Sequence, residues 1–127
     1  MKPFSLAVLL LLLGACAHDL ALMKRDETLN AYRAAIRWGS FDAAAKFQSV
    51  LARRPAMPGD VHEVKVSGYE VIAHVTDQKR MTLTQTVELR YYRTTNLVEK
   101  TTIDEQSWHY DQDEEKWVLD SPLPRFP

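Results

Sequence analysis

The only cysteine, Cys16, has the most distinctive chemistry in the 127-residue chain. A single cysteine cannot form a disulfide within the chain, but its thiolate is a strong nucleophile. Cys16 follows an eight-residue apolar run, Leu6–Leu13, and the small residues Gly14 and Ala15. A membrane span needs ~20 apolar residues, whereas a basic start at Lys2, a short apolar middle and small residues are typical of a secretory signal. We therefore expect the N-terminus to be a processing signal that ends at Cys16.

The tetrapeptide Leu13-Gly14-Ala15-Cys16 resembles the lipobox of bacterial lipoproteins, in which one large apolar residue and two small residues precede an obligatory cysteine. The resemblance implies cleavage between Ala15 and Cys16, a diacylglyceryl thioether on Cys16 and acylation of the new amino group, as with palmitate. Such an anchor far exceeds the marginal membrane binding of one myristoyl chain. The alternative is an ordinary signal peptide that contains a cysteine.

The position after Cys16 bears on where such a lipoprotein is sorted. In enterobacteria-like sorting, an aspartate there retains the protein at the inner membrane, but this chain has Ala17. The resemblance therefore favours the periplasmic leaflet of the outer membrane over the inner membrane. We expect residues 1–15 to be a removed signal peptide and residues 16–21 to be a lipidated tether.

The remaining candidates for metal or nucleic-acid binding are poorly arranged for it. The histidines have no paired spacing and no partner cysteines, so we expect no metal site; they are His18, His62, His74 and His109. The acidic cluster of Asp111, Asp113, Glu114 and Glu115 lacks the glycine and the spaced ligands of a calcium loop, and we interpret it as a solvated turn. Sixteen basic and seventeen acidic residues give a net charge of -1, which predicts no nucleic-acid partner. We also expect no cofactor.

The elements that would position any site begin with two helices. Leu22, Leu29, Tyr32 and Ile36 recur at helical spacing, which predicts a helix over residues 22–38 that stops at Gly39. A second apolar face predicts a helix over residues 41–53, after a cap at Ser40. The short link between the two helices makes them a hairpin.

From residue 61 the apolar period changes to two, which predicts strands over residues 61–76, 81–93, 97–110 and 116–121. Val64 and Val66 share one face, and Tyr69, Val71, Ala73 and Val75 are expected to share the next. The phase slips across Ser67-Gly68, which predicts a β-bulge. In the following strand the apolar face comprises Met81, Leu83, Val87, Leu89 and Tyr91, and later Gln106, Trp108 and Tyr110 share a face.

Short polar turns between these runs predict an antiparallel meander of four strands. Strands of this length must twist and curl, so the helix hairpin can pack into the concave face. We therefore predict one α+β domain over residues 22–127, with an N-terminal helix hairpin on a curved four-stranded antiparallel sheet. Apolar residues at 46% and charged residues at 26% suit such a globular domain.

This order of elements resembles the nuclear-transport-factor-2-like superfamily, a cystatin-like curved α+β fold, and small uncharacterised bacterial lipoproteins of that type. The residues that carry the resemblance are "AYRAAIRWGSFDAAAKF", Tyr91-Tyr92-Arg93, Val98-Glu99-Lys100-Thr101, Trp108 with Tyr110, and the stretch from Trp117 to Pro124. The strand and third helix that the superfamily has between the hairpin and the meander are absent from this pattern, which predicts a shallow concavity. Enzymes of the superfamily use an aspartate or histidine base with a tyrosine or acid as oxyanion donor, so the resemblance implies the candidates His74, His109, Asp104, Tyr69 and Tyr91. None lies in a recognisable motif, and we assign no catalytic residue.

Two surfaces could bind a partner. Arg90, Arg93 and Lys100 could cluster across one hairpin, either as an outer face that blunts edge pairing or as a surface for an acidic partner or lipid headgroups. Trp108, Tyr110 and Trp117 either pack in the core or line the rim of a groove.

The sequence therefore predicts a non-enzymatic lipoprotein of the bacterial envelope that binds a protein partner or assists assembly at the membrane. The alternatives are a small apolar ligand held in the concave sheet and, less favoured, a hydrolase or isomerase.

Overall fold

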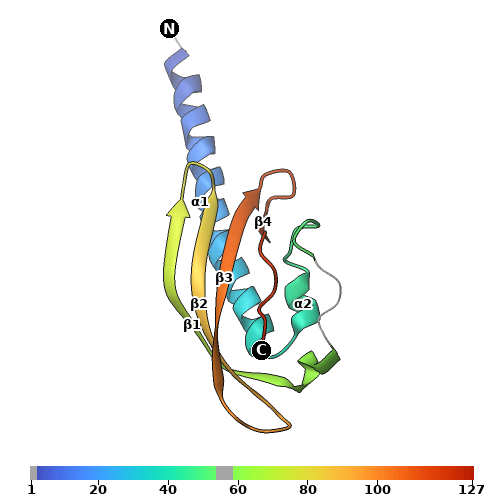
Figure 1. The fold of residues 1–127 in the computed structure, drawn as a ribbon. Helices are drawn as coiled ribbons and strands as arrows, with labels where there is room; N and C mark the ends of the chain where they lie inside the picture. The colour runs from blue at the N-terminus through green and yellow to red at the C-terminus, as the bar shows by residue number, and fades with distance from the viewer. Residues whose placement is uncertain (1–2, 54–58) are drawn as a thin grey trace.

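A computed structural model describes residues 3–53 and 59–127, with side chains described over 18–53 and 61–127. The protein is an α+β structure in which one long helix lies behind a curved, unclosed sheet (Figure 1). The elements are α1 (Pro3–Arg37), α2 (Phe41–Ala45), the 3-10 helix η1 (Gly59–Glu63), β1 (Val64–Asp77), β2 (Thr82–Arg93), β3 (Lys100–Asp111) and β4 (Lys116–Leu119). The four strands form an antiparallel sheet in sequence order, as the meander predicted. No helix in the described ranges is both long and apolar enough to cross a membrane.

Helix α1 is longer than predicted, because its backbone is helical from Pro3 through the expected signal and tether to Arg37. Asp19, which suits an N-cap, lies inside it. The end of the helix agrees with the prediction. Gly39 has φ +72°, and the backbone N–H groups of Gly39 and Ser40 donate to the carbonyls of Ile36 and Ala35. This is the Schellman arrangement, in which a left-handed residue closes the last turn and glycine carries no Cβ penalty.

The predicted second helix is wrong in length, because α2 covers only Phe41–Ala45. The chain then leaves the helix to pair with the outer edge of β4: the N–H of Leu119 donates to Phe47 O at 2.8 Å, and the N–H of Ser49 donates to Leu119 O at 2.9 Å. The resulting parallel bridge joins Gln48 to Leu119. Sheet hydrogen bonds formed far along the chain override the local helical periodicity.

The strand registers confirm the predicted bulge and reveal a second one. Pairing of β1 with β2 shifts between Val66 and Gly68, as expected, and again between Val71 and Ala73. The second shift reverses the inward and outward alternation, so Ala73 and Val75 do not share the face of Tyr69. The prediction of one continuous face to Val75 is therefore wrong. The inner face of β2 is as predicted, with Leu83, Val87, Leu89 and Tyr91 all buried.

The core lies between α1 and the concave face of the sheet. Tyr32 and Ile36 of α1 belong to one buried cluster with apolar residues of all four strands. At one end of the packed region, the indole N–H of Trp117 on β4 donates to Ala21 O. At the other end, Arg37 donates to Val66 O on β1. Helix α1 therefore crosses the sheet diagonally, from β4 to the start of β1.

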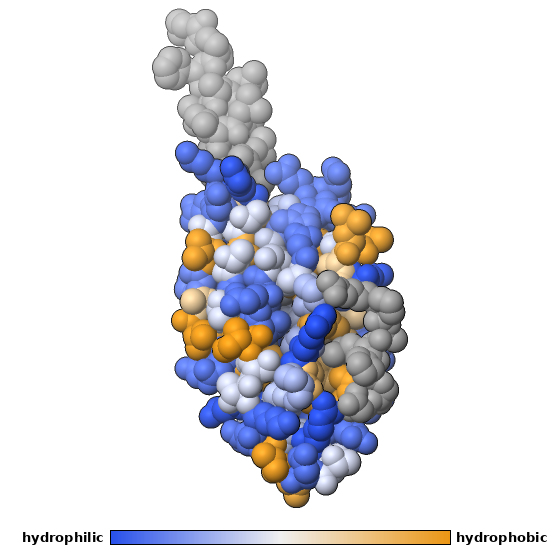
Figure 2. Space-filling view, viewed as in Figure 1, coloured by the Kyte–Doolittle hydropathy of each residue, from blue (hydrophilic) through white to orange (hydrophobic). Residues whose placement is uncertain are grey.

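The diagonal leaves the second half of β1 bare. Arg33 and Arg37 of α1 donate to the carbonyls of Tyr69 and Val66 along the first half of β1. Beyond Tyr69 every residue of β1 is exposed, including the apolar Val71, Ile72 and Val75. Hydrophobic side chains gather along this side of the sheet, and a second group lies over the segment after α2 (Figure 2). We call residues 70–77 of β1 the bare edge.

Candidate functional site: a buried carboxylate beneath helix α1

A cluster of polar side chains is buried on the inner face of the sheet, where apolar residues would be expected. Strand alternation places Gln85 of β2 and both Asp104 and Gln106 of β3 on this face, together with Tyr69 of β1. Tyr32 of α1 lies over them and is fully buried. Burial of several polar groups is unfavourable unless they satisfy one another, so their hydrogen bonds determine whether the cluster is structural or reactive.

The amide of Gln106 organises the cluster. Its Nε2 donates to Asp104 Oδ2 at 2.8 Å and to the hydroxyl of Tyr69 at 3.0 Å. Its Oε1 accepts from Gln85 Nε2 at 2.8 Å and from the indole Nε1 of Trp108 at 3.1 Å. Both ends of this amide are therefore fully used, which fixes its orientation and makes Asp104 an acceptor.

Asp104 is the chemically distinctive member. It is 4% exposed, and no cationic side chain in the described ranges forms an ion pair with it. Desolvation raises the pKa of Asp104 to about 6, although the hydrogen bond from Gln106 lowers it and nearby Glu105 raises it further. A carboxyl group with a pKa in this range can exchange a proton near neutral pH.

Two tyrosines flank this carboxylate. Burial raises the pKa of Tyr69 to about 12, and Arg33 lies over its ring, with 5.6 Å from the guanidinium carbon to the ring centroid. Burial, reinforced by the charge of Asp104, also raises the pKa of Tyr32. The hydroxyl of Tyr32 has no hydrogen-bond partner among the described residues. Both phenols therefore stay protonated, and Tyr32 has a donor proton free.

A row of paired residues connects this cluster to the bare edge. Gln106 lies opposite Gln85 across β2 and β3, and Gln85 lies opposite His74 of β1. The row runs on the inner face from buried Gln106 to exposed His74. Of the five candidates that the family resemblance implied, the structure thus brings Asp104 and Tyr69 together and places His74 at the end of the same row.

The other two candidates lie elsewhere. His109 is on the outer face and pairs through Nδ1 with Asp120. Tyr91 is buried, and its hydroxyl donates to the carbonyl of Pro127, which fastens the C-terminal tail. Neither approaches the buried carboxylate through a hydrogen bond in the described part of the chain.

The three basic residues proposed as a partner surface do not share one face. Arg93 and Lys100 are in register with inward-facing positions of the neighbouring strands, while Arg90 points outward opposite Thr101. Arg93 donates to Phe126 O and so holds the tail. Arg90 covers Gly68, where a Cβ would lie 2.5 Å from its Nε.

The aromatic residues proposed as a groove rim are mainly core residues. Trp108 and Trp117 are 1% and 4% exposed, and Trp108 meets the ring of Tyr32 edge-on with centroids 5.2 Å apart. Tyr110 is half-buried against Trp117. Their packing with α1 fills the centre of the concave face.

Sequence reasoning missed Gln85 and the linking role of Gln106. The sequence contains a signal for both glutamines, because each falls on an inward position of the two-residue strand period. Gln85 lies between the inward residues Leu83 and Val87, and Gln106 lies two residues before Trp108. A glutamine in phase with buried residues must find a buried partner. The acidic turn behaves as expected, since Asp111 Oδ1 accepts from the N–H groups of Asp113 and Glu114. No group of residues suited to a metal occurs in the described ranges.

Comparisons with known families, with curated proteins and with solved structures find no match to this chain. The resemblance to nuclear-transport-factor-2-like proteins and to the lipobox therefore stays a prediction. Cys16 and the expected cleavage point after Ala15 lie in the part of α1 for which only the backbone is described.

Proposed function

We propose that this protein is a lipid-anchored, non-enzymatic module of the bacterial cell envelope that binds a protein partner at the periplasmic face of the membrane. The supporting observation is the place where α1 meets the sheet. The indole N–H of Trp117 donates to the carbonyl of Ala21 at 2.8 Å, and the ammonium group of Lys24 donates to the carbonyl of Glu115 at 3.1 Å. Among the described contacts, hydrogen bonding between α1 and the sheet thus begins at Ala21, five residues after Cys16.

This spacing restricts the domain if Cys16 carries lipid. Five helical residues extend ~8 Å, and even a fully extended segment reaches only ~18 Å. A lipidated Cys16 would therefore hold the folded domain against the membrane. A partner would meet the domain there, at a fixed height and orientation, and the outer membrane is the favoured location because Ala17 follows Cys16.

The bare edge is the surface that we assign to this partner. Among the described residues its backbone has no neighbouring strand on the outer side, because β1 is an edge strand in the sheet order. The side chains of Val71, Ile72 and Val75 are 44%, 50% and 69% exposed. Exposed edges with apolar side chains favour addition of another strand. The filled centre of the concave face makes an apolar ligand there the weaker proposal.

The anchor is tested on Cys16→Ser expressed in a bacterial host. We expect mass spectrometry of the wild-type protein to show a mature chain that starts at Cys16 with added acyl mass, and the variant to lack that mass. Fractionation should move the variant from the membrane to the soluble fraction. A wild-type chain without acyl mass would contradict the anchor.

The partner surface is tested with Val75→Lys, which places a charge on the bare edge. The matched control is Ile103→Lys, because Ile103 is 51% exposed and lies on β3, which β2 separates from the bare edge. We expect crosslinking in intact cells to yield a stoichiometric adduct that Val75→Lys removes and Ile103→Lys keeps. Loss of the adduct with both variants, or with neither, would show that the bare edge does not bind the partner.

A second candidate function rests on Asp104 alone. A buried carboxylate with its pKa raised to about 6, beside the free hydroxyl of Tyr32, suits a general base. Under this candidate, turnover of an ester or an enolisable ketone by the purified chain would fall at least about 100-fold in Asp104→Asn. The exposed control Asp113→Asn would keep it. Turnover that survives Asp104→Asn would eliminate the candidate.

A further inference from the structure

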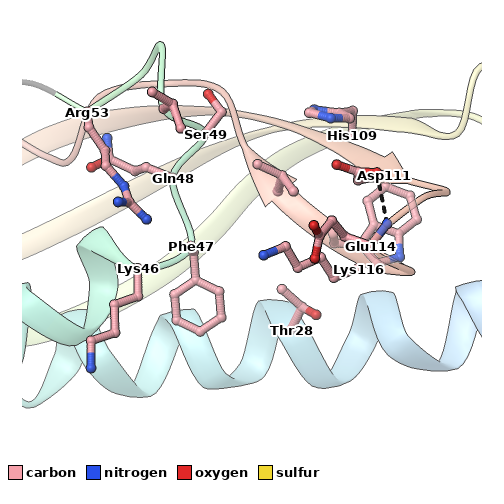
Figure 3. Close-up of a pocket in the computed structure, with 13 residues that line it drawn as sticks. Thr28, Lys46, Phe47, Gln48, Ser49, Arg53, His109, Asp111, Glu114 and Lys116 are labelled. Atoms are coloured by element: carbon pink, nitrogen blue, oxygen red, sulfur yellow. Dashed lines mark hydrogen bonds between the residues drawn. The ribbon is translucent and has the colours of Figure 1, made fainter.

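A half-open cavity of about 480 Å³ lies on the flank of the molecule, away from the buried carboxylate. Its walls come from α1, from the segment that follows α2, and from the β3–β4 hairpin (Figure 3). Phe47 and Trp117 contribute apolar surface. A cavity of this volume is within the range of small-molecule sites, ~300–1,000 Å³.

Two cationic side chains enter this cavity from opposite walls. Arg53 extends from the segment after α2, and Lys116 extends from β4 toward the same space (Figure 3). Neither forms a hydrogen bond or ion pair with any residue in the described ranges. Two unpaired cations that converge on one space repel each other, and an anion between them would relieve that repulsion.

Carboxylates lie beside these cations on the hairpin wall. Asp111 and Glu114 both line the cavity. One oxygen of Asp111 is already occupied by backbone N–H groups of its turn. The carboxylate of Glu114 has no partner within the described part of the chain, and it forms no ion pair with Lys116. The cavity thus presents a positive site and a negative site side by side.

We propose that this cavity binds a zwitterionic phosphate ester, that is, a phosphate group joined by a short linker to an ammonium group. The phosphate lies between Arg53 and Lys116, since a guanidinium binds phosphate oxygens through paired N–H groups and an ammonium adds a point charge. The ligand's ammonium lies at Glu114, and the linker passes over Phe47. Free phosphate fills only part of the cavity and leaves Glu114 unused, so the two charges together define the ligand.

Two kinds of molecule carry a phosphate and an ammonium group joined in this way: a free phosphate ester and the headgroup of a zwitterionic phospholipid. Titration calorimetry on the full chain, purified in a maltoside detergent, separates them. One arm uses O-phosphoethanolamine, and the other uses a short-chain phosphatidylethanolamine below its micelle concentration. Binding in the first arm assigns the free ester, and binding in the second arm alone assigns the headgroup.

The variants decide whether binding uses this cavity. We expect Arg53→Gln and Lys116→Gln each to weaken binding about tenfold, as loss of a charge-assisted contact does. Lys46→Gln is the matched control, because Lys46 lines the same cavity but extends away from the cation pair (Figure 3). Glu114→Gln should weaken binding of the zwitterion and leave binding of inorganic phosphate unchanged.

Two results would overturn the proposal. One is a lack of heat with both ligands up to millimolar concentration, and the other is binding that Arg53→Gln and Lys116→Gln leave unchanged. These outcomes are independent of the proposed anchor, because the same titrations can be run on Cys16→Ser.

Discussion

Gln106 and Asp104 lie two residues apart on β3, and the amide Nε2 of Gln106 donates to Asp104 Oδ2 across 2.8 Å in the interior. The same amide joins Tyr69, Gln85 and Trp108. It satisfies most of the buried polar groups but supplies no positive charge to the carboxylate. Asp104 is therefore held in position while its ionised form stays unfavourable, and this combination has measurable consequences.

The first prediction concerns the pH dependence of stability. The pKa of Asp104 rises from 3.8 to about 6 on folding, so the folded chain binds a proton more tightly than the unfolded chain. The contribution of Asp104 to the free energy of unfolding is complete below about pH 4. It falls by up to ~3 kcal/mol as the pH rises toward about 6, because the folded state disfavours the ionised carboxylate. Asp104→Asn should therefore raise the free energy of unfolding at pH 7.5 by about 1–3 kcal/mol.

Urea unfolding at pH 3.5 and pH 7.5 checks this prediction. The gain from Asp104→Asn should be present at pH 7.5 and vanish at pH 3.5. The exposed Asp113→Asn should change neither value. A gain of equal size at both pH values would mean that ionisation of Asp104 is not responsible.

The second prediction concerns the two tyrosines. The buried hydroxyl of Tyr32 lacks a partner in the described ranges, and an unpaired buried polar group is destabilising. Tyr32→Phe should leave the free energy of unfolding unchanged or raise it by up to about 1 kcal/mol. Tyr69→Phe removes a hydroxyl that accepts a hydrogen bond from Gln106. This variant should lower the free energy of unfolding by about 0.5–1.5 kcal/mol. Thermal unfolding of both variants measures the difference, and equal losses would contradict it.

The third prediction concerns the first β-bulge. A Cβ on Gly68 would lie 2.5 Å from Arg90 Nε and 2.7 Å from its Nη2, so the Arg90 side chain must move in Gly68→Ala. We expect a loss of about 1 kcal/mol that is absent when Arg90 is also changed to Ala. A double-mutant cycle by chemical denaturation gives the coupling energy. A coupling energy near zero would mean that the backbone of the bulge, and not the Arg90 side chain, causes the loss of stability in Gly68→Ala.

The fourth prediction concerns the docking of α1. Trp117→Phe removes the indole N–H that binds Ala21 O in the interior, which should cost about 1–3 kcal/mol. Hydrogen exchange should become faster around residues 21–25 in particular. Trp38→Phe is the control, because Trp38 is 76% exposed at the end of α1 and lies against Arg37. Uniformly faster exchange across the chain would indicate general destabilisation instead.

Part of the fold could be predicted from the sequence because β2 alternates strictly between inward and outward side chains. Leu83, Val87, Leu89 and Tyr91 specify the inner face of β2 by themselves, and Gly39 marks the end of α1 through its conformational freedom. Residues 46–53 were predicted as helix because their spacing is helical. The backbone groups of Phe47 and Ser49 instead pair with Leu119, and no local pattern indicates a partner that lies about 70 residues away.

The candidate site was less accessible to sequence reasoning. Asp104 and Tyr69 were among the candidates, but only the three-dimensional register brings them to a common amide. The second bulge between Val71 and Ala73 was invisible because Ile72 is as apolar as its neighbours. That bulge nevertheless determines that His74 faces inward, opposite Gln85.

The short bridge between Gln48 and Leu119 has a consequence for self-association. It covers one border of the sheet, and the proline-containing tail lies along β3 beside it through Ser121 and Ser107. In the described structure, β1 has no paired strand on its outer side over its whole length, whereas the opposite border is unpaired only over residues 100–106 of β3. A strand from another chain therefore has a much longer run of backbone to pair with at β1. Two copies that pair through β1 would form a closed dimer, in which the same edge of each copy is used.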